Sequence, residues 1–132
     1  MHLALISVLV YNYDEAIVFY TEKLNFILVE DTPLSETKRW VVLKPSLDSQ
    51  CGILLAKAVG EEQRKAIGYQ TGGRVFLFLH TDDFDGMYQR LLAHEIKIVR
   101  PPSVEAYGTV AVFEDLYGNW WDLIQPIKKA LT

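Results

Sequence analysis

Asp122, near the C-terminus, is the residue of this sequence best placed to do chemistry. It belongs to a short apolar run in which the period-two alternation of a strand puts it on the same face as Trp120 and Ile124. A carboxylate in such surroundings can bind a ligand or act as a general acid or base. It can equally be satisfied by backbone donors or by a base such as Arg39, and both interpretations stay open.

His80 is the second candidate for acid-base chemistry. It shares a predicted strand face with Phe76 and Phe78, and four residues of strand place it about 13 Å from position 76. That distance puts it at the mouth of any cavity that the two phenylalanines line. It is either a catalytic base or a rim histidine that makes one hydrogen bond.

Aromatic side chains supply the candidate binding surface. Trp40 and Trp120 can stack on a planar ligand, and Phe76 and Phe78 can line an apolar pocket, although core packing is the commoner use of aromatic residues. Cys51 has no basic neighbour that would activate its thiol. The sequence also contains no Ser-His-Asp order, glycine-rich phosphate loop or Cys/His cluster.

Composition restricts the class of protein. The chain has 132 residues, of which 50% are apolar and 23% charged, which is typical of one globular domain. Its net charge of -4 and scattered basic residues argue against nucleic acid as a partner. A single cysteine excludes an intramolecular disulfide and favours a reducing, cytoplasmic location. The apolar run from 3 to 10 is too short to cross a bilayer, so no membrane association is expected.

The first half of the chain predicts a strand, a helix and three further strands. Asn12 and Glu15 form a pattern typical of a capped helix start. Apolar alternation and turn residues predict the remaining elements. The predicted segments are a strand at 3–10, a helix at 13–24, a strand at 26–30, a turn at 31–33, and strands at 39–44 and 52–56.

The second half repeats this order after a glycine-bracketed segment. Its predicted segments are a strand at 74–81, a helix at 84–94, a strand at 97–100 ended by two prolines, a strand at 107–113, a turn at 115–119 and a strand from 120. Val10-x-Asn12-Tyr13-Asp14 aligns with Thr81-x-Asp83-Phe84-Asp85, at an offset of about seventy residues.

The repeat predicts an α+β fold of two tandem βαβββ modules that form a curled mixed sheet around a cavity. Residues 1–132 are expected to form one domain. Within it we expect a first module over about 1–57, a linker over about 58–73 and a second module over about 74–126.

Two motifs resemble the vicinal oxygen chelate superfamily, which includes glyoxalase I, the bleomycin resistance proteins and the extradiol dioxygenases. The motifs are Val10-x-Asn12-Tyr13-Asp14-Glu15-Ala16-Ile17-x-Phe19-Tyr20-Thr21-x-x-Leu24-x-Phe26 and Phe113-x-Asp115-x-x-Gly118-Asn119-x-Trp121-Asp122-Leu123. The resemblance covers nearly the whole chain and implies the doubled βαβββ fold. It does not decide the function, because this fold hosts both enzymes and binders.

The resemblance also implies four metal-ligand positions, one on the first and one on the last strand of each module. They fall on Leu5, on or beside Leu54, on Phe76 and on Asp122. Only Asp122 can coordinate, and one carboxylate is too few for a catalytic divalent ion. We therefore expect no metal and no other cofactor at this site.

The leading hypothesis is a metal-free binder of a small organic molecule in the cavity between the modules, with a possible use in sequestration or resistance. Its expected contacts are Leu5, Phe76, Phe78, Trp120, Asp122, Arg39 and Trp40. The alternative is a glyoxalase-like lyase or a dioxygenase-type enzyme, in which Asp122 is a metal ligand or, with His80, a general base. A domain kept only for protein association is a third alternative. The resemblance further implies a homodimer.

Overall fold

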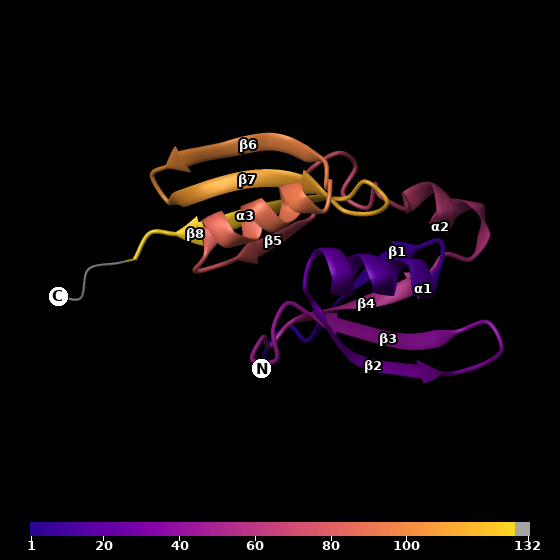
Figure 1. Cartoon of the computed structure of the whole chain (residues 1–132). Coiled ribbons are helices and arrows are strands. Elements are labelled where there is room, and N and C mark those ends of the chain that lie inside the picture. Colours follow the sequence, from indigo (N-terminus) through magenta and orange to yellow (C-terminus); the bar gives the residue numbers. More distant parts are fainter. Residues whose placement is uncertain (129–132) are drawn as a thin grey trace. The chain divides into compact units, whose positions relative to one another are not determined.

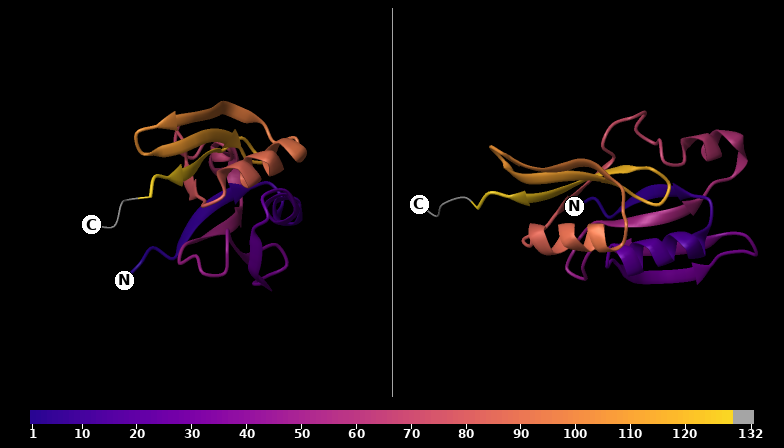
Figure 2. Two further views of the ribbon diagram at one scale, coloured as in Figure 1. Left: turned by 60° about the vertical axis from the view of Figure 1, so that its left-hand side comes forward. Right: turned by 45° about the horizontal axis from the view of Figure 1, so that its top comes forward.

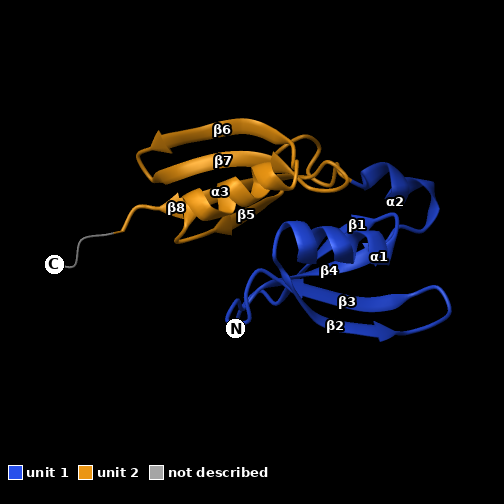
Figure 3. Ribbon diagram, viewed as in Figure 1, with its two compact units in different colours: residues 1–67 blue, residues 68–132 orange. Residues whose placement is uncertain are grey.

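The computed structural model describes residues 1–128 of the chain, whose course is drawn in Figure 1 and Figure 2. The chain divides into two compact units, residues 1–67 and 68–132, which Figure 3 distinguishes by colour. Each unit contains a four-stranded sheet and a helix that follows its first strand.

The first unit has the βαβββ order that the sequence predicts. Its strand order is β1-β4-β3-β2, with β1 parallel to β4 and the other neighbours antiparallel. Helix α1 is prolonged by a short π-helical segment, η1. The elements are β1 (Leu5–Val10), α1 (Tyr13–Val18), η1 (Phe19–Lys23), β2 (Ile27–Pro33), β3 (Arg39–Lys44), β4 (Gly52–Lys57) and α2 (Gly60–Ala66).

Local chemistry starts α1 where the sequence predicts. The Asn12 side chain accepts a hydrogen bond from the Glu15 backbone N–H at 2.8 Å, which satisfies one of the unpaired donors of the first turn. Ala16 and Tyr20, one turn apart, are buried with Val8 and Leu55 of the sheet. One face of the first sheet and its helix thus share a core.

The second unit repeats the arrangement with strand order β5-β8-β7-β6, in which β5 is parallel to β8. In the views of Figure 2, α3 runs along one face of this sheet. Asp83 caps the helix by accepting from the Gly86 N–H at 3.1 Å. The elements are β5 (Leu77–His80), α3 (Phe84–Ala93), β6 (Ile98–Glu105), β7 (Gly108–Glu114) and β8 (Trp120–Pro126).

Alternation along β5 and β8 separates the two faces of the second sheet. Leu77, Leu79 and Leu123 are buried with Leu91 of α3, so they point to the helix side. Phe78, which lies between Leu77 and Leu79, is 62% exposed and points to the opposite side. We call that opposite side the Asp122 face, because the alternation of β8 places Asp122 on it.

Two predicted boundaries are wrong. Residues 31–33 were expected to turn, but β2 continues to Pro33, because Asp31 pairs with Val41 in the sheet. The prolines at 101 and 102 were expected to end a strand, but β6 continues to Glu105. The sheet tolerates them because β6 is an edge strand and shifts register between Arg100 and Ser103.

The fold class is confirmed: two tandem βαβββ-like modules form two mixed four-stranded sheets. The segment predicted as a linker contains α2 and the boundary between the units. A cavity between the modules stays a prediction. None of the helices in residues 1–128 combines the length and the apolar character that crossing a membrane requires.

Candidate functional site

A row of four side chains crosses the centre of the Asp122 face. Asp122 of β8 pairs with Phe78 of β5 on one side and with Val112 of β7 on the other. Val112 in turn pairs with Arg100 of β6. The row therefore runs from an aromatic ring through a carboxylate and an aliphatic group to a guanidinium.

Asp122 and Arg100 line one pocket of about 160 Å³. The other lining residues come from β6, β7 and the turn that joins them; they are Pro101, Ser103, Glu105, Tyr107, Val110, Ala111 and Val112. Glu105 already accepts a hydrogen bond from the Ser103 hydroxyl at 3.0 Å. The pocket thus combines two carboxylates, one guanidinium and a phenol, in a space that suits a small polar group.

The Asp122 carboxylate is the unusual member of this set. Among the described residues of the second unit, no hydrogen bond and no ion pair within 4.0 Å joins it to another group. Desolvation by burial raises the pKa of Asp122, and the positive charge of Arg100 partly opposes that rise. Withdrawal from water destabilises the charged form of a carboxylate that has no partner. Carboxylates with pKa values raised in this way are frequent at binding and catalytic sites.

Asp115, seven residues earlier, shows the opposite environment. It is 6% exposed and accepts hydrogen bonds from the Tyr117 N–H, the Asn119 N–H, the Asn119 side-chain amide and the Trp121 indole, at distances from 2.9 to 3.1 Å. These bonds build the predicted turn, in which Gly118 takes a φ of 101°. Asp115 therefore holds the hairpin that presents Asp122.

Phe76 and Trp120, the other aromatic candidates of the second unit, lie at one end of the same face. The Phe76 N–H donates to the Trp120 carbonyl at 2.8 Å, and both side chains border a pocket of about 100 Å³. The Trp120 indole donates to Glu114 at 3.2 Å, which fixes its orientation. His80 is exposed and pairs with Ile124, about 7 Å along β8 from Asp122, so it lies beside the central row and not in it.

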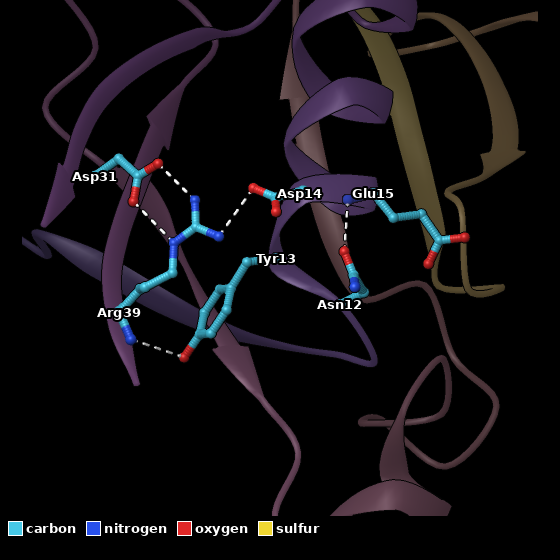
Figure 4. Close-up of polar contacts among 6 residues, drawn as sticks. All are labelled: Asn12, Tyr13, Asp14, Glu15, Asp31 and Arg39. Atoms are coloured by element: carbon cyan, nitrogen blue, oxygen red, sulfur yellow. Dashed lines mark hydrogen bonds and ion pairs between the residues drawn. The ribbon is translucent and has the colours of Figure 1, made fainter. Parts of the chain in front are cut away.

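Arg39, a predicted ligand contact, is bound by other side chains of the first unit, as Figure 4 shows. Its guanidinium forms two hydrogen bonds with Asp31, at 3.0 and 2.6 Å, and one with Asp14 at 2.8 Å. It also lies over the ring of Tyr13. The bonds to Asp31 and then Asp14 raise the pKa of Arg39, while the bond from Arg39 lowers the pKa of Asp31. Arg39 is thus held by carboxylates of its own unit, and within the second unit Arg100 is the base whose charge acts on Asp122.

Trp40, the other candidate of β3, borders a larger pocket within the first unit. Its indole is 36% exposed. The pocket has a volume of about 520 Å³, within the range of small-molecule sites, and is also bordered by Leu54, Ala56, Lys57 and Gln63. Trp40 is therefore accessible to a planar ligand, whereas Arg39, which borders the same pocket, is held by its carboxylates.

The residues at the positions where the family resemblance places metal ligands do not fit a metal ion. In the first sheet, Leu54 occupies the place that Asp122 has in the second, because it pairs with Ser7 of β1 and Val42 of β3. Leu54, Leu5 and Phe76 have no donor atoms in their side chains. Among the residues that the structure describes, no three His, Cys, Asp or Glu side chains within either unit form a group that could hold a metal.

Sequence reasoning missed Arg100 as a site residue. The predicted strand 97–100 contained Arg100, but its place in the row of Asp122 depends on the pairing of β6 with β7 and on the register shifts on both sides of Arg100. The pairing of the strand at 97–100 with the strand at 107–113 would have identified it. An edge strand of the second module should cross the same row as Asp122, two strands away.

Comparisons with known proteins agree with this architecture. An uncharacterised protein of Shewanella frigidimarina is 56% identical over 126 residues, which cover 95% of this chain and 91% of that protein. The crystal structure of UcmS2 matches with a TM-score of 0.81 and 29% identity, covering 94% of this chain and 97% of that one. The crystal structure of TnmS3, an antibiotic-binding protein from Streptomyces sp. CB03234, matches with a TM-score of 0.78 and 28% identity, covering 96% and 97%.

The family comparison covers nearly the whole chain. Residues 2–123 match the model of the glyoxalase/bleomycin resistance protein/dioxygenase superfamily. The matched range includes both βαβββ modules as far as Leu123, and with it Arg39, Trp40, Phe78, Arg100 and Asp122. The chain belongs to the glyoxalase/bleomycin resistance protein/dioxygenase superfamily.

Proposed function

We propose that this protein binds a small, partly apolar or aromatic organic molecule without the help of a metal ion, and that the Asp122 face contributes to the binding site. The observation that carries the proposal is the Asp122 carboxylate, which lines a pocket, has no partner among the described residues of the second unit and lies beside the exposed ring of Phe78. A ligand that places an apolar part on the ring and a polar part on the carboxylate would satisfy both.

One solved structural neighbour supports a binding role. TnmS3 is an antibiotic-binding protein, and the chain matches it over nearly its full length. Leu5, Leu54 and Phe76 also leave the superfamily's metal-ligand positions without donor atoms. We infer sequestration of a toxic organic compound as the use of the site, with Trp40 of the first unit as a further stacking surface. A dimer, which the sequence predicts, stays a prediction.

The test is a thermal-shift screen of the full chain after dialysis against a chelator. Antibiotics and other aromatic compounds are added one at a time. Binding at one hundred times the Kd stabilises a protein by about 2.7 kcal/mol, so a true ligand raises the Tm by several degrees. Mass spectrometry of the ligand released from the protein should then show that the compound is chemically unchanged. A ligand that binds only after a divalent metal is restored would contradict the proposal.

The raised pKa of Asp122 favours one second candidate, an enzyme in which this carboxylate removes a proton from a substrate without a metal. The same recovery experiment separates the two functions. Turnover of a bound compound that Asp122→Asn abolishes, while binding persists, would identify the enzyme. A metal-dependent lyase or dioxygenase predicts instead about one bound ion per chain, lost in Asp122→Ala, by elemental analysis.

A further inference from the structure

The charges around the pocket of the Asp122 face restrict what it can hold. Asp122 accepts hydrogen bonds only, and so does Glu105, which the Ser103 hydroxyl already contacts. Arg100 is a donor only. The two carboxylates leave the pocket with one excess negative charge, so an anionic group would be repelled and a cationic group attracted.

The spacing of the row leaves room for a bound group. Asp122 and Arg100 lie on strands separated by β7, so their backbones are about 10 Å apart. The two side chains attract each other, yet no ion pair within 4.0 Å joins them in the described residues. The first unit offers no equivalent, because its matching row ends in Glu30 and has Leu54 at the centre.

Neutral donors would satisfy Asp122 less well than a cation. Any hydrogen bond to the Asp122 carboxylate is charge-assisted, but only a cationic donor adds a Coulombic attraction that offsets the cost of withdrawing the carboxylate from water. An oxygen atom next to that cation would face Arg100. Phe78 stands on the other side of Asp122 and offers its exposed ring to the apolar body of the same molecule.

We propose that Asp122 binds a protonated amine of the ligand and that Arg100 binds an oxygen acceptor beside that amine, so that the ligand class is an aromatic or apolar amine with a neighbouring hydroxyl or carbonyl. This inference rests on the proposed function and adds the chemical class of its ligand. The pocket of about 160 Å³ holds the amine end, and the rest of the molecule extends over Phe78.

The test uses four phenols that differ only in their side arm: tyramine, octopamine, 4-hydroxyphenylacetate and p-cresol. Each is titrated into the ¹⁵N-labelled full chain, and Kd values are taken from the amide shifts of β5, β7 and β8. Tyramine should bind about tenfold more tightly than p-cresol, because it adds a charge-assisted hydrogen bond to Asp122, and about tenfold more tightly than the acid, because the excess negative charge of the pocket repels a carboxylate. Octopamine, whose hydroxyl neighbours the amine, should bind more tightly still.

Variants assign these differences to residues. Asp122→Asn keeps the shape of the side chain and should weaken tyramine about tenfold while leaving p-cresol unchanged. Arg100→Gln should remove the advantage of octopamine over tyramine. Glu105→Gln is the matched comparison, because it deletes an equal charge from the same pocket at a carboxylate that is already bonded, and it should weaken tyramine clearly less than Asp122→Asn does.

Three results would overturn the inference: equal Kd values for tyramine and p-cresol, tighter binding of the acid, or an equal effect of Asp122→Asn and Glu105→Gln. If p-cresol and tyramine bind equally and shift the same amides, the ligand class is wrong and the proposed function stands. If none of the four phenols shifts the amides of the Asp122 face, the amine site is refuted. The screen of antibiotics then decides the proposed function by itself.

Discussion

The turn around Asp115 and the face around Asp122 show two uses of the same carboxylate group within one hairpin. Asp115 is almost fully buried and accepts four hydrogen bonds, so its charge is satisfied by the fold. Asp122 is partly buried, and no hydrogen bond or ion pair joins it to another described residue of the second unit. The first carboxylate builds the turn, and we propose that the second binds a ligand.

The two sheets repeat this contrast at matched positions. Leu54 in the first sheet and Asp122 in the second occupy the centre of equivalent rows, and the rows end in Glu30 and Arg100. A duplicated module has therefore kept its backbone while only one copy presents a charged pair. We propose that this difference between the copies concerns binding, because only the second row combines a carboxylate with a guanidinium.

The largest expected effect is on the turn. Asp115→Ala should lower the free energy of unfolding by about 3 kcal/mol, because it leaves the buried donors of Asn119 and Trp121 without an acceptor. Urea denaturation measures the loss, and Asp122→Ala serves as the matched control. A loss no greater than that of the control would remove the distinction between the two carboxylates.

The next largest loss of stability is expected when a carboxylate is placed in the first sheet at the position that Asp122 has in the second. Leu54→Asp should cost about 2 kcal/mol, because the new carboxylate would be desolvated in a row that ends in Glu30 and has no arginine. Leu54→Asn separates the cost of the charge from that of polarity. If Leu54→Asp is as stable as the natural chain, the rows do not differ as described.

Replacing Arg39 should destabilise the fold more than replacing Arg100. Arg39→Ala should cost about 1 kcal/mol, because it breaks a bidentate ion pair with Asp31 and leaves two carboxylates near each other. Arg100→Ala should change the stability by less, since Arg100 has no ion pair within 4.0 Å in the described residues. Thermal unfolding of both variants compares them directly, and equal losses would argue against a free Arg100.

The smallest expected effect is a gain in stability. Asp122→Asn should stabilise the fold at neutral pH by about 0.5 kcal/mol, a figure reduced for solvent screening because the carboxylate is part exposed. Because the pKa of Asp122 is raised in the fold, its protonation stabilises the natural chain as the pH falls through that pKa towards 3.8, the ordinary value of an aspartate. The gap between the two proteins should therefore shrink over that range.

Protonation of Asp31 has the opposite effect on the stability of the fold in the same titration. Arg39 lowers its pKa, so Asp31 stabilises the fold above pH 3.8 and loses that contribution as the pH falls through its depressed pKa. Denaturation curves of the natural chain and of Asp122→Asn, collected from neutral pH downward, separate the two carboxylates. A gap that stays constant with pH would show that Asp122 is not desolvated.

Much of the fold could be predicted from local pattern. The cap at Asn12, the turn at Asp115 and the alternation through Asp122 all depend on neighbours within a few residues, and the structure contains all three. The boundaries at Pro33 and Pro101 were wrong because an edge strand can accept a proline where pairing on its other side holds it. That compensation comes from a strand distant in the sequence.

The sequence by itself determined the duplicated βαβββ order, the position of Asp122 on one strand face and the lack of donor atoms at Leu5, Leu54 and Phe76, since strand period and side-chain chemistry are local properties. Tertiary structure alone decided which arginine lies near which aspartate. Arg39 binds Asp31 and Asp14, and Arg100 crosses the row of Asp122. The physical reason is that cross-strand neighbours are set by register and bulges, which no short stretch of chain specifies.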